Sequence, residues 1–255
     1  MSWRLRRQFS LVMTVVLFLV LVGGLYFYFT NPLPTCADNK QNQKELGVDC
    51  GGPCAKVCRF ETANLIVLWT RVFEITPGNY SAIAYIENPN RQFGLADFDY
   101  QFILTSATGA EVARTTGRSF ANSKERFIIF SSNITAPAGT VSRAFLEFPS
   151  PLTWQRSAKT DLKLEIKRKS FTMEPTPNLV AEAHSGEVKT LNRIPVYVVL
   201  SDKNGNAISA SATFIDQLPG QGVADIYFTW PVPLSDTPVF FDFYPHPNLL
   251  ETGSL

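Results

Sequence analysis

The segment Val198–Ile208, VVLSDKNGNAI, decides the fold that this sequence predicts. Apolar residues flank a polar centre, where Asn204-Gly205 supplies the two positive-φ positions that a type I′ turn needs. The polar run that starts at Asp202 also imitates a calcium-binding loop, but Ala207 stands where such a loop requires glycine. The segment therefore predicts a β-hairpin.

A shift of 96 residues superimposes Phe102–Val112, FILTSATGAEV, on Val198–Ile208. The glycine of the predicted turn is retained as Gly109. Two aromatic runs, Phe127–Phe130 and Tyr227–Trp230, follow the two segments at similar distances. This internal similarity predicts two copies of one sandwich topology rather than one large domain.

Short apolar runs separated by turn residues extend the pattern from Phe60 onward. Many alternate apolar and polar residues with a period of two, which indicates half-buried antiparallel strands. Phe, Tyr, Val, Ile and Thr are plentiful, as in all-β domains. We expect strands at Asn64–Ile75, Ser81–Glu87, Phe98–Thr105, Glu111–Thr116, Arg126–Phe130, Ser142–Phe148, Leu162–Lys167, Leu179–His184, Val196–Ser201, Ala207–Phe214, Ala224–Trp230 and Val239–Tyr244.

The proline-rich segment MEPTP, residues 173–177, predicts a short stiff linker, because proline blocks a continuing sheet and favours extended structure. We therefore place a first β-sandwich at residues 60–172, a linker at 173–178, a second β-sandwich at 179–250 and a tail at 251–255.

The two repeated segments resemble the FxLYD-type domain, a small immunoglobulin-like β-sandwich of prokaryotic envelope proteins. The resemblance implies two tandem immunoglobulin-like β-sandwiches in the cell envelope, and it implies no catalytic residues. It rests on Phe102, Leu104, Leu200 and Asp202, which match the motif, while Thr105, Ser106, Val198 and Ser201 depart from it.

The segment Phe9–Phe29 holds no charged residue and is long enough, at about 31 Å as a helix, to cross a bilayer. Arg4, Arg6 and Arg7 precede it, and no Lys or Arg follows until Lys40. The positive-inside rule therefore predicts a single-pass signal anchor at 9–29, a cytoplasmic N-terminus at 1–8 and an extracytoplasmic remainder.

There are two alternatives to this anchor, a cleaved signal peptide and a lipoprotein. A cleaved signal peptide has a shorter apolar region and a small-residue cleavage site, which the sequence after Phe29 lacks. Lipidation at Cys36 requires small residues directly before the cysteine, where Pro34-Thr35 stands.

All four cysteines, Cys36, Cys50, Cys54 and Cys58, fall within one short polar stretch. An even count in an exterior segment too polar to form a core predicts two disulfides in a stalk at residues 30–59, with the pairing left open. The alternative is a zinc or iron–sulfur site, although the three-residue gaps differ from the usual two-residue spacing.

The cysteine stretch resembles a short module of bacterial extracellular proteins with the pattern C-x-D-G-x-x-N-x-x-E-x-G-x-D-C-G-G-x-C. Asn39 replaces one glycine of that pattern, and Asn tolerates the left-handed backbone region. Four residues of the module offer oxygen atoms, so they are weak candidates for calcium ligands; turn capping is the favoured interpretation. These residues are Asp38, Asn42, Glu45 and Asp49.

The sequence offers little catalytic chemistry. His184 and His246 are the only histidines, and no nucleophile elbow, metalloprotease motif or phosphate-binding glycine loop occurs. The chain's net charge of +1 falls to −2 outside the membrane once the three N-terminal arginines are excluded, so nucleic acid is not an expected partner. We expect no catalytic residue, no cofactor and no confident metal site.

Exposed aromatic residues are the better functional candidates. Trp154 lies between proline and charged residues and is a weak candidate for binding, whereas Trp69 and Trp230 fit a buried core. We expect a membrane-anchored, extracytoplasmic binding or scaffolding module whose partner is an envelope protein or a surface glycan. The alternative function is an accessory or degenerate enzyme that acts on cell-wall glycan.

Overall fold

The computed structural model describes residues 3–30, 35–157 and 162–250. Within the first of these ranges, side chains are described for residues 8–28. The expected tail at 251–255 lies outside these residues. The chain divides into two compact units, Met1–Cys58 and Arg59–Leu255. In the first unit, helix α1 (Trp3–Thr30) contains the span Gln8–Tyr28, which has a mean hydropathy of 2.4 and no buried residue. One N-terminal helix is thus long and apolar enough to cross a membrane, as the sequence predicts.

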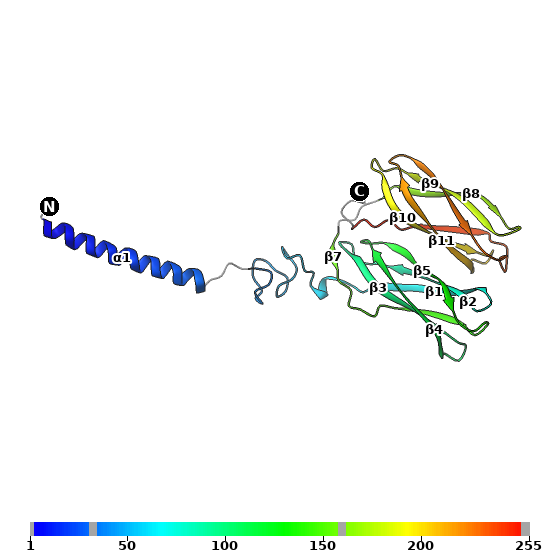
Figure 1. Cartoon of the computed structure of the whole chain (residues 1–255), viewed down its shortest axis with the longest axis horizontal. Helices are drawn as coiled ribbons and strands as arrows, with labels where there is room; N and C mark the ends of the chain where they lie inside the picture. The colour runs from blue at the N-terminus through cyan, green and yellow to red at the C-terminus, as the bar shows by residue number, and fades with distance from the viewer. Residues whose placement is uncertain (1–2, 31–34, 158–161, 251–255) are drawn as a thin grey trace. The chain divides into compact units, whose positions relative to one another are not determined.

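The second unit is built of β-strands, and each expected strand is present (Figure 1). The sequence missed the two-residue strand β7, and most other errors are extensions of strand ends. The elements are η1 (Arg59–Glu61), β1 (Ile66–Thr76), β2 (Asn79–Glu87), β3 (Phe93–Thr105), β4 (Glu111–Ala121), β5 (Arg126–Thr135), β6 (Arg143–Glu147), β7 (Gln155–Arg156), β8 (Leu164–Thr172), β9 (Asn178–Ser185), β10 (Leu191–Ser201), β11 (Ala207–Leu218), β12 (Val223–Thr229) and β13 (Phe240–Pro245). The prediction of an all-β fold is confirmed.

The first sandwich consists of the antiparallel sheets β1-β2-β5 and β4-β3-β6, with β7 paired to β3. Alternate residues of the two central strands point into one core, where Ala84 and Ile86 of β2 share a cluster with Phe102 and Leu104 of β3. Each large apolar side chain buried there stabilises the fold by about 1.5–3 kcal/mol relative to its exposure to water. The period-two pattern of these strands therefore reports the face that each strand turns inward.

The second sandwich repeats the same strand order in the sheets β8-β9-β12 and β11-β10-β13. The equivalence extends to the register: Phe102 pairs with Thr115 in the first copy, and Val198 pairs with Ser211 in the second, again 96 residues later. Both ladders also shift register at the last pair before the turn. The internal repeat inferred from sequence is a repeat of structure.

The boundary between the sandwiches differs from the expected one. Strand β8 pairs with β9, and Ile166 and Phe171 of β8 pack on the second core. Residues 173–177 of the expected linker 173–178 are therefore the connection between β8 and β9 rather than a linker between domains, and the second sandwich begins with β8. The domain boundary was mispredicted because proline is as common in the turn between two paired strands as in a linker between domains.

The hairpin turn is also built differently from the predicted type I′ turn. Only Gly205 has a positive φ, of 80°, and its N–H donates to the Asp202 carbonyl over 3.1 Å. Gly109 occupies the same conformation in the first copy, with φ 85°. The register shift beside each turn is a bulge that supplies the required twist, so one left-handed residue suffices instead of two.

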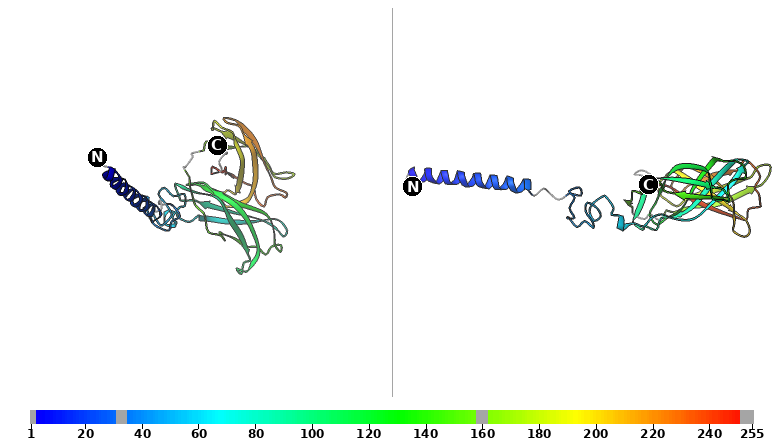
Figure 2. Two further views of the ribbon diagram at one scale, coloured as in Figure 1. Left: turned by 60° about the vertical axis from the view of Figure 1, so that its left-hand side comes forward. Right: turned by 90° about the horizontal axis from the view of Figure 1, so that it is seen from below.

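The two sandwiches are joined face to face; the left-hand view of Figure 2 shows the first (cyan to green) beside the second (yellow to orange). Ile83 and Ile128, on the outer face of β1-β2-β5, form one buried cluster with Val199 and Ala210, on the outer face of β11-β10-β13. The two middle sheets are consequently covered on both faces. Residues 59–157 and 162–250 form a four-layer stack, so the two sandwiches pack on each other instead of standing apart.

The C-terminal segment fastens the second sandwich to the first. The Asn122 amide donates to the Pro247 carbonyl over 3.0 Å, and its oxygen accepts the Leu249 N–H over 3.0 Å. The His246 ring stacks on Phe120 and Phe127 of the first sandwich, with ring centroids 4.0 and 4.8 Å away. We call the segment 245–250 the C-terminal strap.

Candidate binding site at the junction of the two sandwiches

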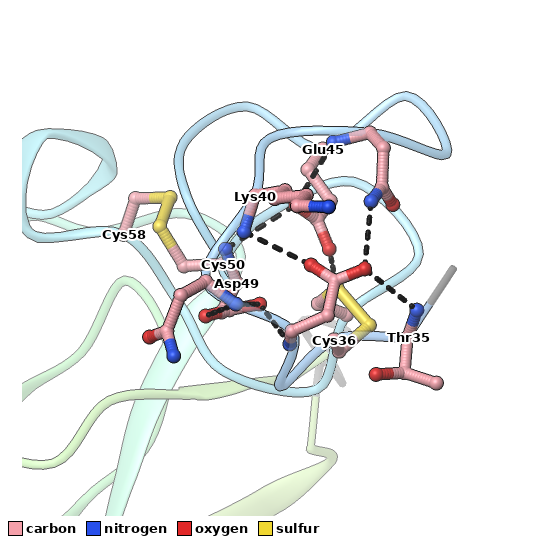
Figure 3. The surroundings of a disulfide bond; sticks show 11 residues. Thr35, Cys36, Lys40, Glu45, Asp49, Cys50 and Cys58 are labelled. Atoms are coloured by element: carbon pink, nitrogen blue, oxygen red, sulfur yellow. Dashed lines mark hydrogen bonds between the residues drawn. A yellow bond between two sulfur atoms is a disulfide. The ribbon is translucent and has the colours of Figure 1, made fainter. Parts of the chain in front are cut away.

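The four cysteines form two disulfides, Cys36–Cys54 and Cys50–Cys58, which cross each other along the chain (Figure 3). This confirms the predicted disulfides and supplies the pairing that the sequence left open. The alternative zinc or iron–sulfur site is wrong for these residues, because a sulfur in a disulfide is not a thiolate ligand. A Glu45 carboxylate oxygen lies within 4.8 Å of the Cys36 and Cys54 sulfurs. Because these two sulfurs are bonded to each other, the three residues do not form a metal site.

The four weak calcium candidates lie together in the module, and the carboxylate oxygens of three of them, Asp38, Glu45 and Asp49, cap backbone turns. The side-chain oxygen of Asn42 is buried without a hydrogen-bond partner among the described residues. The Asp49 carboxylate accepts the N–H groups of Asp38 and Asn39, and Asn39 is left-handed, with φ 57°. The buried Glu45 carboxylate accepts the N–H groups of Asn42 and Asp49.

Asp38 completes this set of caps. Its carboxylate accepts the Asn42 side-chain amide over 2.9 Å and the N–H of Lys40 over 2.9 Å, and the bond from Asn42 contributes most to lowering the pKa of Asp38. These contacts match the capping interpretation, in which short polar side chains replace the missing secondary structure of a coreless segment.

Trp154, the weak binding candidate, is half-buried and packs against the core of the first sandwich beside Leu152. Trp230 is buried in the second core, as predicted. Trp69, which was also expected in a core, instead lies half-buried at the junction of the two sandwiches. The aromatic residue with the most unusual setting is therefore Trp69.

The two histidines lie in different places, and each has a carboxylate beside its Nε2. His184 is on the outer face of β9, with its Nε2 3.4 Å from the Glu182 carboxylate. His246 is 1% exposed within the C-terminal strap, with its Nε2 3.3 Å from a Glu125 oxygen. Their settings are those of a surface polar contact and an interdomain packing residue.

A hollow of about 300 Å³ opens at one end of the junction, and we call it the junction pocket. Small-molecule sites are frequent at such interfaces between domains. Its walls come from β1, β10, β13 and the hairpin that joins β10 to β11. The lining residues are Trp69, Arg71, Val199, Ser201, Gly205, Ala207, Asp242 and Tyr244.

Three aromatic rings form the apolar wall behind the pocket. Trp69 packs on Tyr85 with a centroid separation of 5.5 Å, and Tyr85 meets Tyr244 edge-on at 5.3 Å. Burial, with the nearby Asp242 carboxylate, raises the pKa of Tyr244 to about 12. The phenol therefore keeps its proton at neutral pH and remains a hydrogen-bond donor.

Two opposite charges line the same pocket from different sandwiches. The Arg71 guanidinium lies over the Trp69 ring, 5.9 Å from its centroid, and donates one hydrogen bond to the Thr70 carbonyl. Within the described part of the chain, neither Arg71 nor Asp242 makes an ion pair. The pocket thus offers a cation, an anion and an aromatic surface that are all free to meet a ligand.

Sequence reasoning missed this site because its residues come from two domains that the linker interpretation kept apart. One signal was present: the runs Ala82–Ile86 and Tyr197–Leu200 are continuously apolar instead of alternating, which is typical of strands covered on both faces. That signal indicates a covered face but does not identify its cover.

No protein-family model matches this chain. A search of curated proteins finds no similar sequence.

Proposed function

We propose that this protein is a membrane-anchored binding or scaffolding module that displays two fused immunoglobulin-like sandwiches outside the cytoplasm and has no catalytic activity. The observation that carries the proposal is the junction: two sandwiches joined into one body, with an open pocket at the seam. A fixed seam presents residues from both domains in one geometry, as a binding surface requires.

The display outside the cytoplasm is supported by two features of the first unit. Helix α1 exposes its whole apolar surface, with Phe18 64% and Leu17 65% exposed, so it needs a lipid or protein cover. The two disulfides suggest an oxidising compartment for residues 36–58. Arginines at the start of helix α1, before the apolar span, and the bacterial-type cysteine pattern after the helix support an N-terminus in the cytoplasm and a location in the envelope.

The experiment uses the full-length chain in the cells that produce it. A photo-crosslinking amino acid replaces Phe145, Phe214 or Tyr227, each about half exposed on the sandwiches. We expect one dominant cross-linked envelope component from at least one position. Absence of any cross-link at all three positions would contradict a binding role.

Two further measurements test the remaining parts of the proposal. Protease added to intact cells should degrade residues 60–255, and full protection would overturn the orientation. Purified full-length protein should leave cell-wall glycan intact, whereas release of soluble fragments would favour the alternative of a glycan-acting enzyme.

A further inference from the structure

We propose that the junction pocket binds a carbohydrate through one sugar ring, held between the aromatic wall and the side chains of Arg71 and Asp242. This inference rests on the proposed binding function and names its ligand class.

The junction pocket combines an aromatic surface with a polar rim. Trp69 and Tyr244 are half-buried, so part of each ring still faces the pocket, and they flank it from different sandwiches. The C–H face of a sugar ring is apolar and packs on such aromatic surfaces, while its edge carries hydroxyl groups. A ligand with one apolar face and a polar edge matches a pocket with one aromatic wall and a polar rim.

Arg71 and Asp242 place a positive and a negative charge in the lining of the junction pocket. Arg71 only donates hydrogen bonds, and the ionised Asp242 only accepts them. An anionic ligand would be repelled by Asp242, a cationic ligand by Arg71, and an apolar ligand would leave both without partners. Sugar hydroxyls both donate and accept, so neighbouring hydroxyls can satisfy the carboxylate and the guanidinium together.

The junction pocket is large enough for one sugar ring and is open to solvent. The volume of about 300 Å³ lies at the lower limit of the range of about 300–1,000 Å³ that small-molecule pockets occupy. Arg71, Asp242 and Gly205 are exposed, so the polar rim is open to solvent. A terminal or branch residue of a longer glycan can therefore enter without rearrangement of the sandwiches.

The test uses full-length protein labelled with 5-fluorotryptophan, in a detergent without a sugar headgroup. Fluorine NMR follows each tryptophan separately while D-glucose, D-galactose, D-mannose or N-acetyl-D-glucosamine is added. We expect at least one sugar to shift the Trp69 resonance in a saturable manner, while Trp154 and Trp230 stay fixed. Trp154 is the internal control, since it is the half-buried tryptophan outside the pocket.

Two variants test the polar rim. Asp242→Asn and Arg71→Gln should each weaken sugar binding at least tenfold, because each leaves hydroxyl groups without a charged partner. Asp216→Asn is the matched control, since Asp216 is an exposed carboxylate on β11 outside the pocket lining, and it should bind sugar like the unmodified protein.

Three outcomes would overturn the inference: no saturable Trp69 shift with any of the four sugars, equal binding by Asp242→Asn, or a saturable shift with glycine alone, which would indicate a site for zwitterions. These outcomes are separable from failure of the proposed function. Cross-linking at Phe145, Phe214 and Tyr227 detects a bound partner at positions outside the pocket. Cross-links at these positions, together with no shift of the Trp69 resonance on addition of sugar, would therefore overturn the sugar site only.

Discussion

The sheets β4-β3-β6 and β11-β10-β13 are equivalent in strand order and register, yet one faces solvent and the other is buried in the junction. The pair Ile103–Arg114 in the first sheet corresponds to Val199–Ala210 in the second. Arg114 makes an exposed ion pair with Glu111, whereas Ala210 is 4% exposed against the other sandwich. Topology is therefore shared, and a few outward-facing side chains decide whether a sheet stacks.

The contrast also explains why the stack stops at two sandwiches. The free face of the second sandwich carries Lys169 between Glu182 and Asp225, and these partners raise the pKa of Lys169 to about 12. The free face of the first carries Arg118 paired with Asp97 and Asp99. Each sandwich uses a different one of its two sheets in the junction. If the two free outer faces were apolar, further copies of the chain could therefore associate head to tail, and the charges on these faces oppose such association.

The largest expected effect comes from placing a charge in the junction. Val199→Lys puts an ammonium group where the side chain is 3% exposed, so we expect a loss of about 3 kcal/mol or more in unfolding free energy. The matched control is Ile103→Lys at the equivalent position on the outer face of β3, where the side chain is only half-buried, so the loss should be no more than about 1 kcal/mol. Urea unfolding followed by circular dichroism measures both, and equal losses would contradict the contrast between the sheets.

Next in size is the C-terminal strap, for which the first sandwich has no counterpart. Asn122→Ala removes both side-chain contacts to the strap and should cost about 2 kcal/mol, since the Pro247 carbonyl loses its donor in a buried setting. Hydrogen exchange should accelerate at Leu249 and nearby amides. Asn64→Ala, on the exposed surface, is the control; exchange at Leu249 unchanged in Asn122→Ala would argue against the strap.

A smaller and equal effect is expected at the two repeated turns. Gly109→Ala and Gly205→Ala each place a side chain at a positive φ, of 85° and 80°, with open space around the added atom. Backbone strain alone should therefore cost about 1 kcal/mol in each copy. Thermal unfolding measures both variants, with Thr108→Ala as a control, and clearly unequal losses would break the equivalence of the hairpins.

The smallest effect distinguishes the hairpins by pH. The Asn206 N–H, with that of Asn204, donates to Asp202 and lowers the pKa of its carboxyl group. A lowered pKa means that this contribution to stability is present above the unfolded pKa of about 3.9 and is lost as the pH falls through the folded value. Asp202→Ser copies Ser106 of the first hairpin and should remove this acid sensitivity. Carboxyl NMR titration checks the shift, and a midpoint at or above the unfolded value would contradict it.

Prediction succeeded where local pattern and physics coincide. Strand positions, the repeat and the disulfides follow from period-two alternation, from a glycine retained 96 residues apart and from an even cysteine count. The boundary at 173–178 failed because proline marks a turn within a domain and a linker between domains in the same way. Trp69 lies at the junction rather than in the core of one sandwich, because flanking residues do not reveal which outer sheet face another domain covers. The binding role of Trp154 stays a prediction.

The sequence by itself determined that the chain has one apolar helix, a disulfide-rich segment and two copies of one β topology, since each is a property of neighbouring residues. Only the tertiary structure decided that the two copies stack through different sheets, and that Arg71 and Asp242 meet in one pocket. The physical reason is that burial of a sheet's outer face depends on a second sandwich that is distant in the sequence. Alternation records that a face is apolar, and packing alone decides what covers it.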